Sequence, residues 1–204
     1  MKRKNEPAAG IAPEYITVIE NCEPEISEWV LLEYKNASEI TSGKIIYAST
    51  ADKKLEPFGA IDERPFTEII EPEKTIILDP AAEKPLAAED FRNFKYLVFG
   101  GICGDYPPKA RTGPLVSCRM PKAELRHLGP KQLSTDSAVL MAKLISLGAK
   151  IGEIETTECL TVEYEGGESF VLPFGYVVLN DKIMMTPGLL ELLKSRREDE
   201  GRVF

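Results

Sequence analysis

The run Val98–Pro114, VFGGICGDYPPKARTGP, combines residue types that bind or act on ligands. A hydrophobic stretch ends in two glycines, and an acid (Asp105), two prolines and two bases (Lys109 and Arg111) follow in quick succession. A segment so polar and so interrupted by proline and glycine does not suit a buried core. It predicts a loop that holds a ligand.

Three predicted strands end in glycine, proline or both, at 98–101, 126–130 and 171–175. In an open α/β sheet ligands bind at the carboxyl ends of the strands, and glycine lets backbone amides approach a ligand closely. We therefore expect the three ends to converge on one pocket. The alternative at any single one of them is an ordinary turn.

The elements that must position these loops follow from the hydrophobic pattern. Buried strands are predicted at 15–20, 44–49, 75–80 and 94–101, a short strand at 123–129, a hairpin over 160–174 and a further strand at 176–185. Helices are predicted at 27–40, at 134–148 with Ser134 or Thr135 as cap, and at 186–198 with Thr186 as cap. Strands that alternate with helices predict an α/β fold with a mostly parallel sheet.

Composition narrows the class of partner. The 204 residues suit one domain, with residues 1–13 as a disordered tail, and 25 basic against 33 acidic residues give a net charge of −8. This balance favours a basic protein or a small ligand, although a local basic patch could still bind RNA. No run of about 18 apolar residues and no signal peptide is visible, so we expect no membrane contact and a cytoplasmic location.

Several site classes lack their motifs. The four cysteines are far apart and His127 is the only histidine, so no zinc site is readable. The sequence has no GxxxxGK[ST] loop, no GxGxxG after its first strand and no GxSxG. A nucleoside triphosphatase, a dinucleotide dehydrogenase and a serine hydrolase are therefore disfavoured.

Four blocks stand out together: IENCEPEISEWVLLEY (19–34), YLVFGGICGDYPPKARTGPL (96–115), RHLGPKQLSTDSAV (126–139) and LPFGYV (172–177). In residues, order and spacing they resemble a family of SPOUT-type methyltransferases, once described as predicted RNA methyltransferases, which includes a yeast arginine methyltransferase of a small-subunit ribosomal protein. The resemblance covers about 15–195. It implies one domain over 14–204, a parallel sheet flanked by helices, and a deep trefoil knot within about 94–200.

The resemblance also implies that the three glycine-marked ends bind S-adenosylmethionine as cofactor. The adenine would lie in a flat apolar slot made by Leu128, Gly129, Leu172, Pro173 and Phe174. Phe99, Gly100 and Gly101 would give the ribose and methionine portions close backbone approach. For Thr135 a cofactor contact is the alternative to a role as helix cap.

A guanidinium acceptor calls for carboxylates and for a base that takes its proton. Asp105 is our first candidate, with an Asx-turn before the prolines as the alternative. Glu20 and Glu28 are candidates for acceptor binding, with solvated or helix-capping roles as the alternative. Arg111 would clamp the cofactor carboxylate or an acceptor phosphate, or else pin the loop through backbone carbonyls.

This chain departs from the yeast member in basic residues near the implied site. Tyr106 replaces a histidine, Gly175 an arginine and His127 a second arginine. We expect a monomeric methyltransferase that acts on an arginine of a ribosomal or other basic protein. The alternatives are an rRNA or tRNA methyltransferase, a ribosome-associated binding module with weak catalysis and, least favoured, a small-molecule α/β enzyme.

Overall fold

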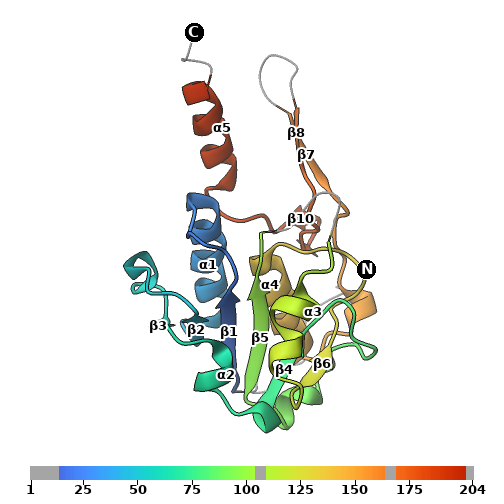
Figure 1. Ribbon diagram of the computed structural model, residues 1–204. Helices are drawn as coiled ribbons and strands as arrows, with labels where there is room; N and C mark the ends of the chain where they lie inside the picture. Colours follow the sequence, from blue (N-terminus) through green and yellow to red (C-terminus); the bar gives the residue numbers. More distant parts are fainter. Residues whose placement is uncertain (1–13, 104–108, 164–168, 201–204) are drawn as a thin grey trace.

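A computed structural model describes residues 14–103, 109–163 and 169–200, the last five without their side chains. The predicted tail 1–13 lies outside these residues. The centre of the fold is a six-stranded sheet of order β3-β2-β1-β5-β4-β6 (Figure 1) in which every neighbouring pair is parallel. The strands are β1 Ile16–Asn21, β2 Ile45–Ala48, β3 Ala60–Asp62, β4 Thr75–Leu78, β5 Tyr96–Gly101 and β6 Glu124–Arg126.

The sheet is parallel throughout because helices and turns carry the chain back between its strands, which confirms the predicted α/β class. All five predicted strands of the sheet are present. The edge strand β3 was not predicted, because three residues are too few to show a period of two.

Two long helices cover one face of the sheet. Helix α1 (Glu28–Thr41) packs beside α4 (Thr135–Ser146), and both lie on the larger core cluster, which includes Tyr34, Ile76 and Leu97. The other face packs against the short helix α2 (Phe66–Ile69) and the segment that follows the short helix α3 (Thr112–Leu115). Single 3₁₀ turns lie at Lys53–Leu55, Pro72–Lys74, Asp90–Arg92, Ser117–Arg119 and Ile151–Glu153.

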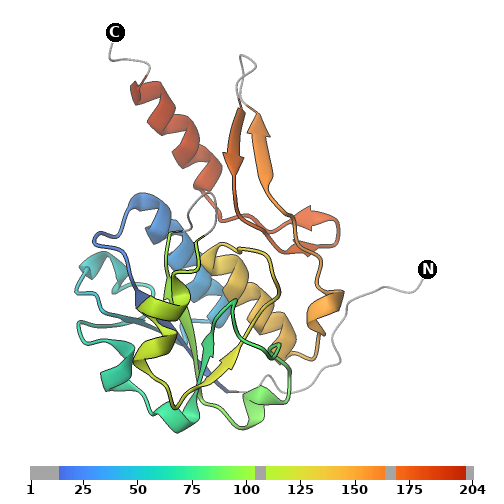
Figure 2. The ribbon, with the colours of Figure 1, turned by 45° about the vertical axis from the view of Figure 1, so that its right-hand side comes forward.

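The C-terminal part leaves the sheet and projects beyond the carboxyl ends of its strands (Figures 1 and 2). The predicted hairpin is present as β7 (Leu160–Glu163) and β8 (Ser169–Leu172), which pair antiparallel. The single strand predicted at 176–185 is wrong. Asn180 and Asp181 adopt positive φ angles of 50° and 61°, and they reverse the chain between the two-residue strands β9 (Val178–Leu179) and β10 (Lys182–Ile183).

One predicted helix cap is wrong, and a second has the predicted position but makes no cap hydrogen bond. Helix α5 (Leu189–Glu200) begins at Leu189 rather than near Thr186, because the Thr186 hydroxyl donates to Asp136 Oδ2 at 2.7 Å. Ser134 lies at the N-cap position of α4, but its hydroxyl donates to Asp136 Oδ1 at 2.7 Å and makes no cap hydrogen bond. Buried polar partners outcompete local capping at both positions.

The described helices include none that is long and apolar enough to cross a bilayer. The trefoil knot expected within 94–200 stays a prediction.

Candidate functional site

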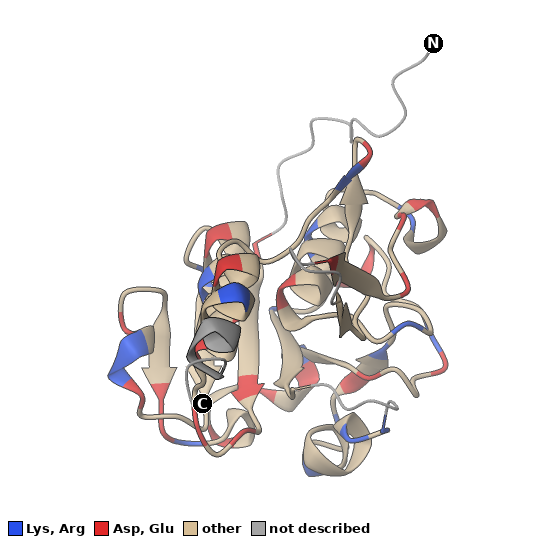
Figure 3. Cartoon of the chain, turned by 90° about the horizontal axis from the view of Figure 1, so that it is seen from above, with Lys and Arg blue, Asp and Glu red and all other residues tan. Residues whose placement is uncertain are grey.

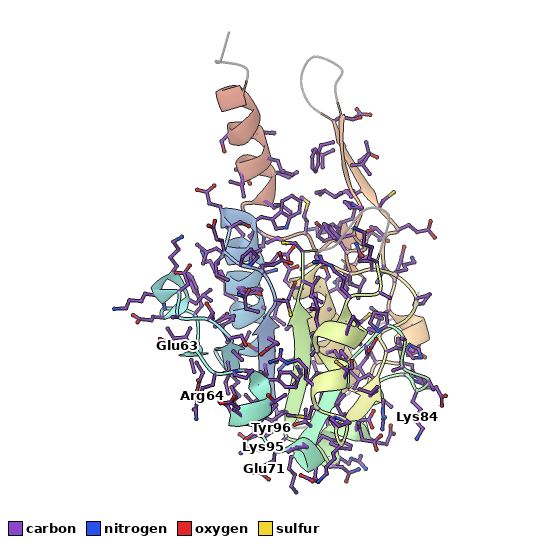
Figure 4. The ribbon with its side chains drawn as sticks, in the orientation of Figure 1. Glu63, Arg64, Glu71, Lys84, Lys95 and Tyr96 are labelled. Carbon is purple, nitrogen blue, oxygen red and sulfur yellow. The ribbon has the colours of Figure 1, made fainter. Side chains whose placement is uncertain are left out.

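A cavity of about 430 Å³ lies at the carboxyl ends of β4, β5 and β6. Its walls come from the ends of these strands, from residues 109–113, which lead into α3 and form its start, and from the loop that leads into α4. The opposite end of the sheet, where Glu71, Lys95 and Tyr96 lie near one another (Figure 4), takes no part in it. The volume lies within the range of sites for small molecules and cofactors.

The first glycine-marked end lines this cavity in part. Phe99 and Gly100 are lining residues, and the cofactor contact predicted for them stays a prediction. Gly101 is not, because a side chain there would point away from the cavity into the core and overlap the Tyr34 hydroxyl. The absence of a Cβ at Gly101 therefore allows close packing against Tyr34, and a cofactor contact at Gly101 stays a prediction.

The second glycine-marked end forms the opposing wall. Leu128 and Gly129 both line the cavity, and Gly129 has a positive φ of 101° with open space where a Cβ would be. His127 Nδ1 accepts a 3.0 Å hydrogen bond from the Gly129 amide. The histidine therefore shapes this loop, a role that the sequence did not indicate.

The third glycine-marked end does not reach the cavity. Leu172 is fully buried in a separate cluster with α5. The rings of Phe174 and Trp29 pack edge to face with centroids 6.2 Å apart, and Pro173 is absent from the lining. These three residues therefore do not line this cavity, and the ring-binding slot that the sequence predicts for them stays a prediction. Gly175 instead braces the wall, since its amide donates to the Gln132 carbonyl at 2.8 Å.

Asp79 lines the cavity, although the sequence pattern indicated only a buried strand over 75–80 at this place. It follows β4 and is 5% exposed. Its Oδ1 accepts from the Ala81 amide at 2.9 Å and its Oδ2 from the Ser117 hydroxyl at 2.5 Å. An acid directly after a buried strand in an α/β sheet was the available signal.

Arg111 lines the cavity and also holds the loop that precedes it. Its guanidinium donates to the Cys103 carbonyl and lies 3.8 Å from the Glu23 carboxylate, which accepts from the Cys103 amide at 2.7 Å. This geometry matches the alternative in which Arg111 pins the loop through a backbone carbonyl. Asp105 and Tyr106 lie outside the described residues.

The two predicted acceptor-binding glutamates lie elsewhere. Glu20 is 1% exposed, and its carboxylate accepts from the Ser49 hydroxyl at 2.8 Å and the Phe66 amide at 3.0 Å. An ion pair of 2.5 Å with Arg119 completes its partners, so Glu20 has a structural role. Glu28 is the exposed first residue of α1, where an acid favours the helix dipole, and it does not line the cavity.

Behind the cavity wall lies a buried pair of acids. Glu33 on α1 accepts from the Thr135 amide at 3.1 Å and from Trp29 Nε1 at 2.7 Å, and Thr135 lines the cavity. Asp136 accepts from Asn36 and Thr186, each at 2.7 Å. Burial and the nearby Asp136 charge raise the pKa of Glu33 from 4.5 to about 7.

A second cavity of about 410 Å³ lies at the carboxyl ends of β1 and β2, on the same edge of the sheet. Its lining is mainly polar and includes Glu23, Glu25 and Asp52.

The described residues contain no group of three or more His, Cys, Asp or Glu side chains that could hold a metal ion. Burial raises the pKa of the Cys22 and Cys103 thiols to about 11, which disfavours a thiolate nucleophile at either position.

Charges of both signs are interspersed around this end of the molecule (Figure 3). In this view the Lys and Arg positions of the described residues form no continuous run, because Asp and Glu positions lie between them.

Comparisons with known proteins agree with this architecture. The family model described as protein arginine N-methyltransferase SFM1-like matches residues 16–200. Protein arginine N-methyltransferase SFM1 of Saccharomyces cerevisiae is 30% identical over 199 residues, which cover 87% of this chain and 93% of that protein.

Solved structures give the same result. The yeast SFM1 structure complexed with SAM superposes with a TM-score of 0.82 at 29% identity, covering 90% of this chain and 91% of that one. The structure of a dual specific Trm10 from Thermococcus kodakaraensis, with a TM-score of 0.56 at 15% identity over 68% of this chain and 96% of that one, shares the fold alone. The chain belongs to the SFM1-like family of protein arginine N-methyltransferases.

Proposed function

We propose that this protein transfers a methyl group from S-adenosylmethionine to an arginine side chain of a basic protein. The observation that carries the proposal is the cavity in which the glycine-marked ends of β5 and β6 face one another, in a chain of the SFM1-like family. Yeast SFM1 has been solved with SAM, SAH and MTA. Because methyl transfer is an in-line displacement, the protein's main task is alignment of the reacting groups.

The lining suits such a cofactor. Leu128 and Phe99 offer apolar surface, and Gly100 and Gly129 leave backbone within reach of a ligand. When bound, the cofactor supplies an electrophilic methyl group on a positively charged sulfur. Thr135 lines the cavity at the start of α4, and the hydrogen bond from its amide to the Glu33 carboxylate keeps it in place.

The proposed methyl acceptor, an arginine side chain, is a cation. An arginine side chain is charged at all physiological pH values, so a carboxylate that binds it and takes its proton is needed. We propose Asp105 as this carboxylate, on the sequence pattern alone. The second cavity with Glu23, Glu25 and Asp52 and the net charge of −8 both favour approach of a basic protein segment.

We further propose that the enzyme works as a cytoplasmic monomer. One chain supplies all the described walls of the cavity, and Cys22, Cys103, Cys118 and Cys159 are free thiols, as a reducing compartment favours. Sedimentation that showed a stable dimer at low micromolar concentration would contradict the monomer.

The test of the proposed reaction uses cell extract that lacks this protein, purified enzyme and cofactor with a labelled methyl group. We expect one dominant labelled band of ribosomal-protein size that protease removes and ribonuclease does not, with methylarginine on hydrolysis. A ribonuclease-sensitive, protease-resistant label would move the activity to RNA. No label, together with no cofactor binding, would leave only a binding role.

A further inference from the structure

Asp79 is a buried carboxylate on the wall of the proposed cofactor cavity. Among the described residues that line this cavity it is the only acid. Its side chain is held firmly, because Ala81 and Ser117 each donate to a different oxygen. A carboxylate offers about four acceptor positions, so roughly two remain for a ligand.

The charge of Asp79 has no cationic partner among the described residues. None of the ion pairs of the described chain includes it, although Lys109, Arg111 and Lys131 line the same cavity. Among the other buried acids, Glu20 pairs with Arg119 and Asp90 with Arg126, whereas Glu33 and Asp136, which also lack a cationic partner among the described residues, lie behind the cavity wall and do not line it. A buried carboxylate without a counter-charge is costly, and a cationic ligand group would remove that cost.

The geometry points to Asp79 as the residue that binds the α-ammonium group of the cofactor's amino-acid end. This inference rests on the cofactor proposed above. An ammonium group carries a full charge and donates up to three hydrogen bonds, so it satisfies both the charge and the open acceptor positions. Ribose hydroxyls donate without neutralising the charge, and a sulfonium carries charge without an N–H or O–H donor.

The remaining lining fits the other half of an amino-acid zwitterion. The ligand carboxylate needs bases, and the 109–113 and 130–135 segments bring three to the same cavity. One acid and several bases around a single cavity are the arrangement that a zwitterion requires.

Calorimetric titration with three ligands separates the possibilities. S-adenosylmethionine has both the ammonium and the sulfonium, S-adenosylhomocysteine has the ammonium alone, and methylthioadenosine has neither but keeps the ribose. The variant is Asp79→Asn, which keeps the shape and an oxygen for the Ala81 amide. The matched control is Asp62→Asn, which removes the same charge at the carboxyl end of β3, outside both cavities.

For Asp79→Asn we expect the Kd of S-adenosylhomocysteine and S-adenosylmethionine to rise at least tenfold, equivalent to about 1.4 kcal/mol, and that of methylthioadenosine to stay within about twofold. Asp62→Asn should leave all three unchanged. Equal weakening of all three ligands would make Asp79 a ribose-binding or loop-shaping residue, and weakening of S-adenosylmethionine alone would make it a sulfonium partner. Either result, or no change, overturns the inference.

A second measurement does not depend on the variant's folding. The unsubstituted protein should bind the S-adenosylhomocysteine analogue that lacks the α-amino group at least tenfold more weakly than S-adenosylhomocysteine itself. Equal binding of the two overturns the inference while the cofactor proposal stands. If the unsubstituted protein binds none of the ligands, the cofactor proposal itself fails, and this inference with it.

Discussion

The carboxylate of Glu33 on α1 accepts a 3.1 Å hydrogen bond from the backbone N–H of Thr135, the first residue of α4. The first N–H groups of a helix have no partner within it, and the hydroxyl of Ser134, at the cap position, is turned to Asp136 instead. Glu33, far away in the sequence, therefore accepts from one of the unpaired N–H groups at the start of α4, the helix whose first turn lines the proposed cofactor cavity.

Glu33 should make stability depend on pH. Its pKa is about 7 in the folded protein, against 4.5 ordinarily, because burial and the Asp136 charge disfavour its ionised form. Between these pH values the folded state binds a proton that the unfolded chain has lost, so this residue's contribution to the free energy of unfolding falls as pH rises from about 5 through 7. Urea unfolding of the wild type and Glu33→Gln at pH 5.5 and pH 8 measures the contribution.

We expect the free energy of unfolding of the wild type, compared with that of Glu33→Gln, to be lower at pH 8 than at pH 5.5. The groups that face Glu33 include Asp136 and Tyr176, and Trp29 and Thr135 hydrogen-bond to it. Parallel pH dependence of the two proteins would show that Glu33 titrates normally.

Gly101 and Tyr34 should be energetically coupled. A Cβ at Gly101 would overlap the Tyr34 hydroxyl, with Ile19 Cγ2 next nearest at 3.0 Å. Gly101→Ala should cost about 1–3 kcal/mol, as overpacking of a core does. Tyr34→Phe removes a 3.2 Å hydrogen bond to Asn21 and should cost about 1 kcal/mol.

In the double variant the two costs should not add, because the hydroxyl that obstructs the alanine is gone. Chemical denaturation of all four proteins gives the coupling energy, which we expect to exceed about 1 kcal/mol. Simple additivity would mean that the Gly101 backbone shifts rather than meeting Tyr34.

Gly175 should tolerate no side chain. A Cβ there would lie 2.9 Å from the Thr157 carbonyl oxygen and 3.0 Å from Leu133 Cδ2. Gly175→Ala should lose about 1–3 kcal/mol of stability and weaken cofactor binding, because Leu133 lines the cavity.

The matched control is Gly152→Ala. A Cβ at this position has no atom within 4 Å, so the change should be neutral or stabilising by up to about 1 kcal/mol. Thermal unfolding measures the stability of each variant and calorimetry measures its cofactor binding. Equal effects of the two substitutions would refute steric exclusion at Gly175.

Asp105→Asn tests the proposed acceptor-side carboxylate. Loss of a general base slows a reaction by about 10²–10⁴-fold, so we expect a drop of at least about 100-fold in transfer with cofactor affinity within a few-fold of wild type. Glu73→Gln, in the turn just before β4, should change neither. A loss of cofactor affinity as large as the loss of activity would instead make Asp105 a loop-shaping residue.

The sequence by itself determined the parallel α/β class and the family, and of the three glycine-marked strand ends that it indicated, two line the cavity. Buried parallel strands appear as short runs of β-branched and apolar residues, so β1, β4 and β5 were readable from their own residues. Phe99, Gly100, Leu128 and Gly129 were identified because strand ends are local features and the sheet brings them to one edge.

Only the tertiary structure decided which groups share an environment. Asp79 gains its role from the cavity and from Ser117, and Glu33 from Thr135, partners that lie far away in the chain. Leu172 and Phe174 pack with α5 and Trp29 rather than in the cavity, because the C-terminal segment builds a core of its own. Periodicity and local motifs report the conformation of a segment, whereas the partners of a buried charge depend on the packing of distant segments.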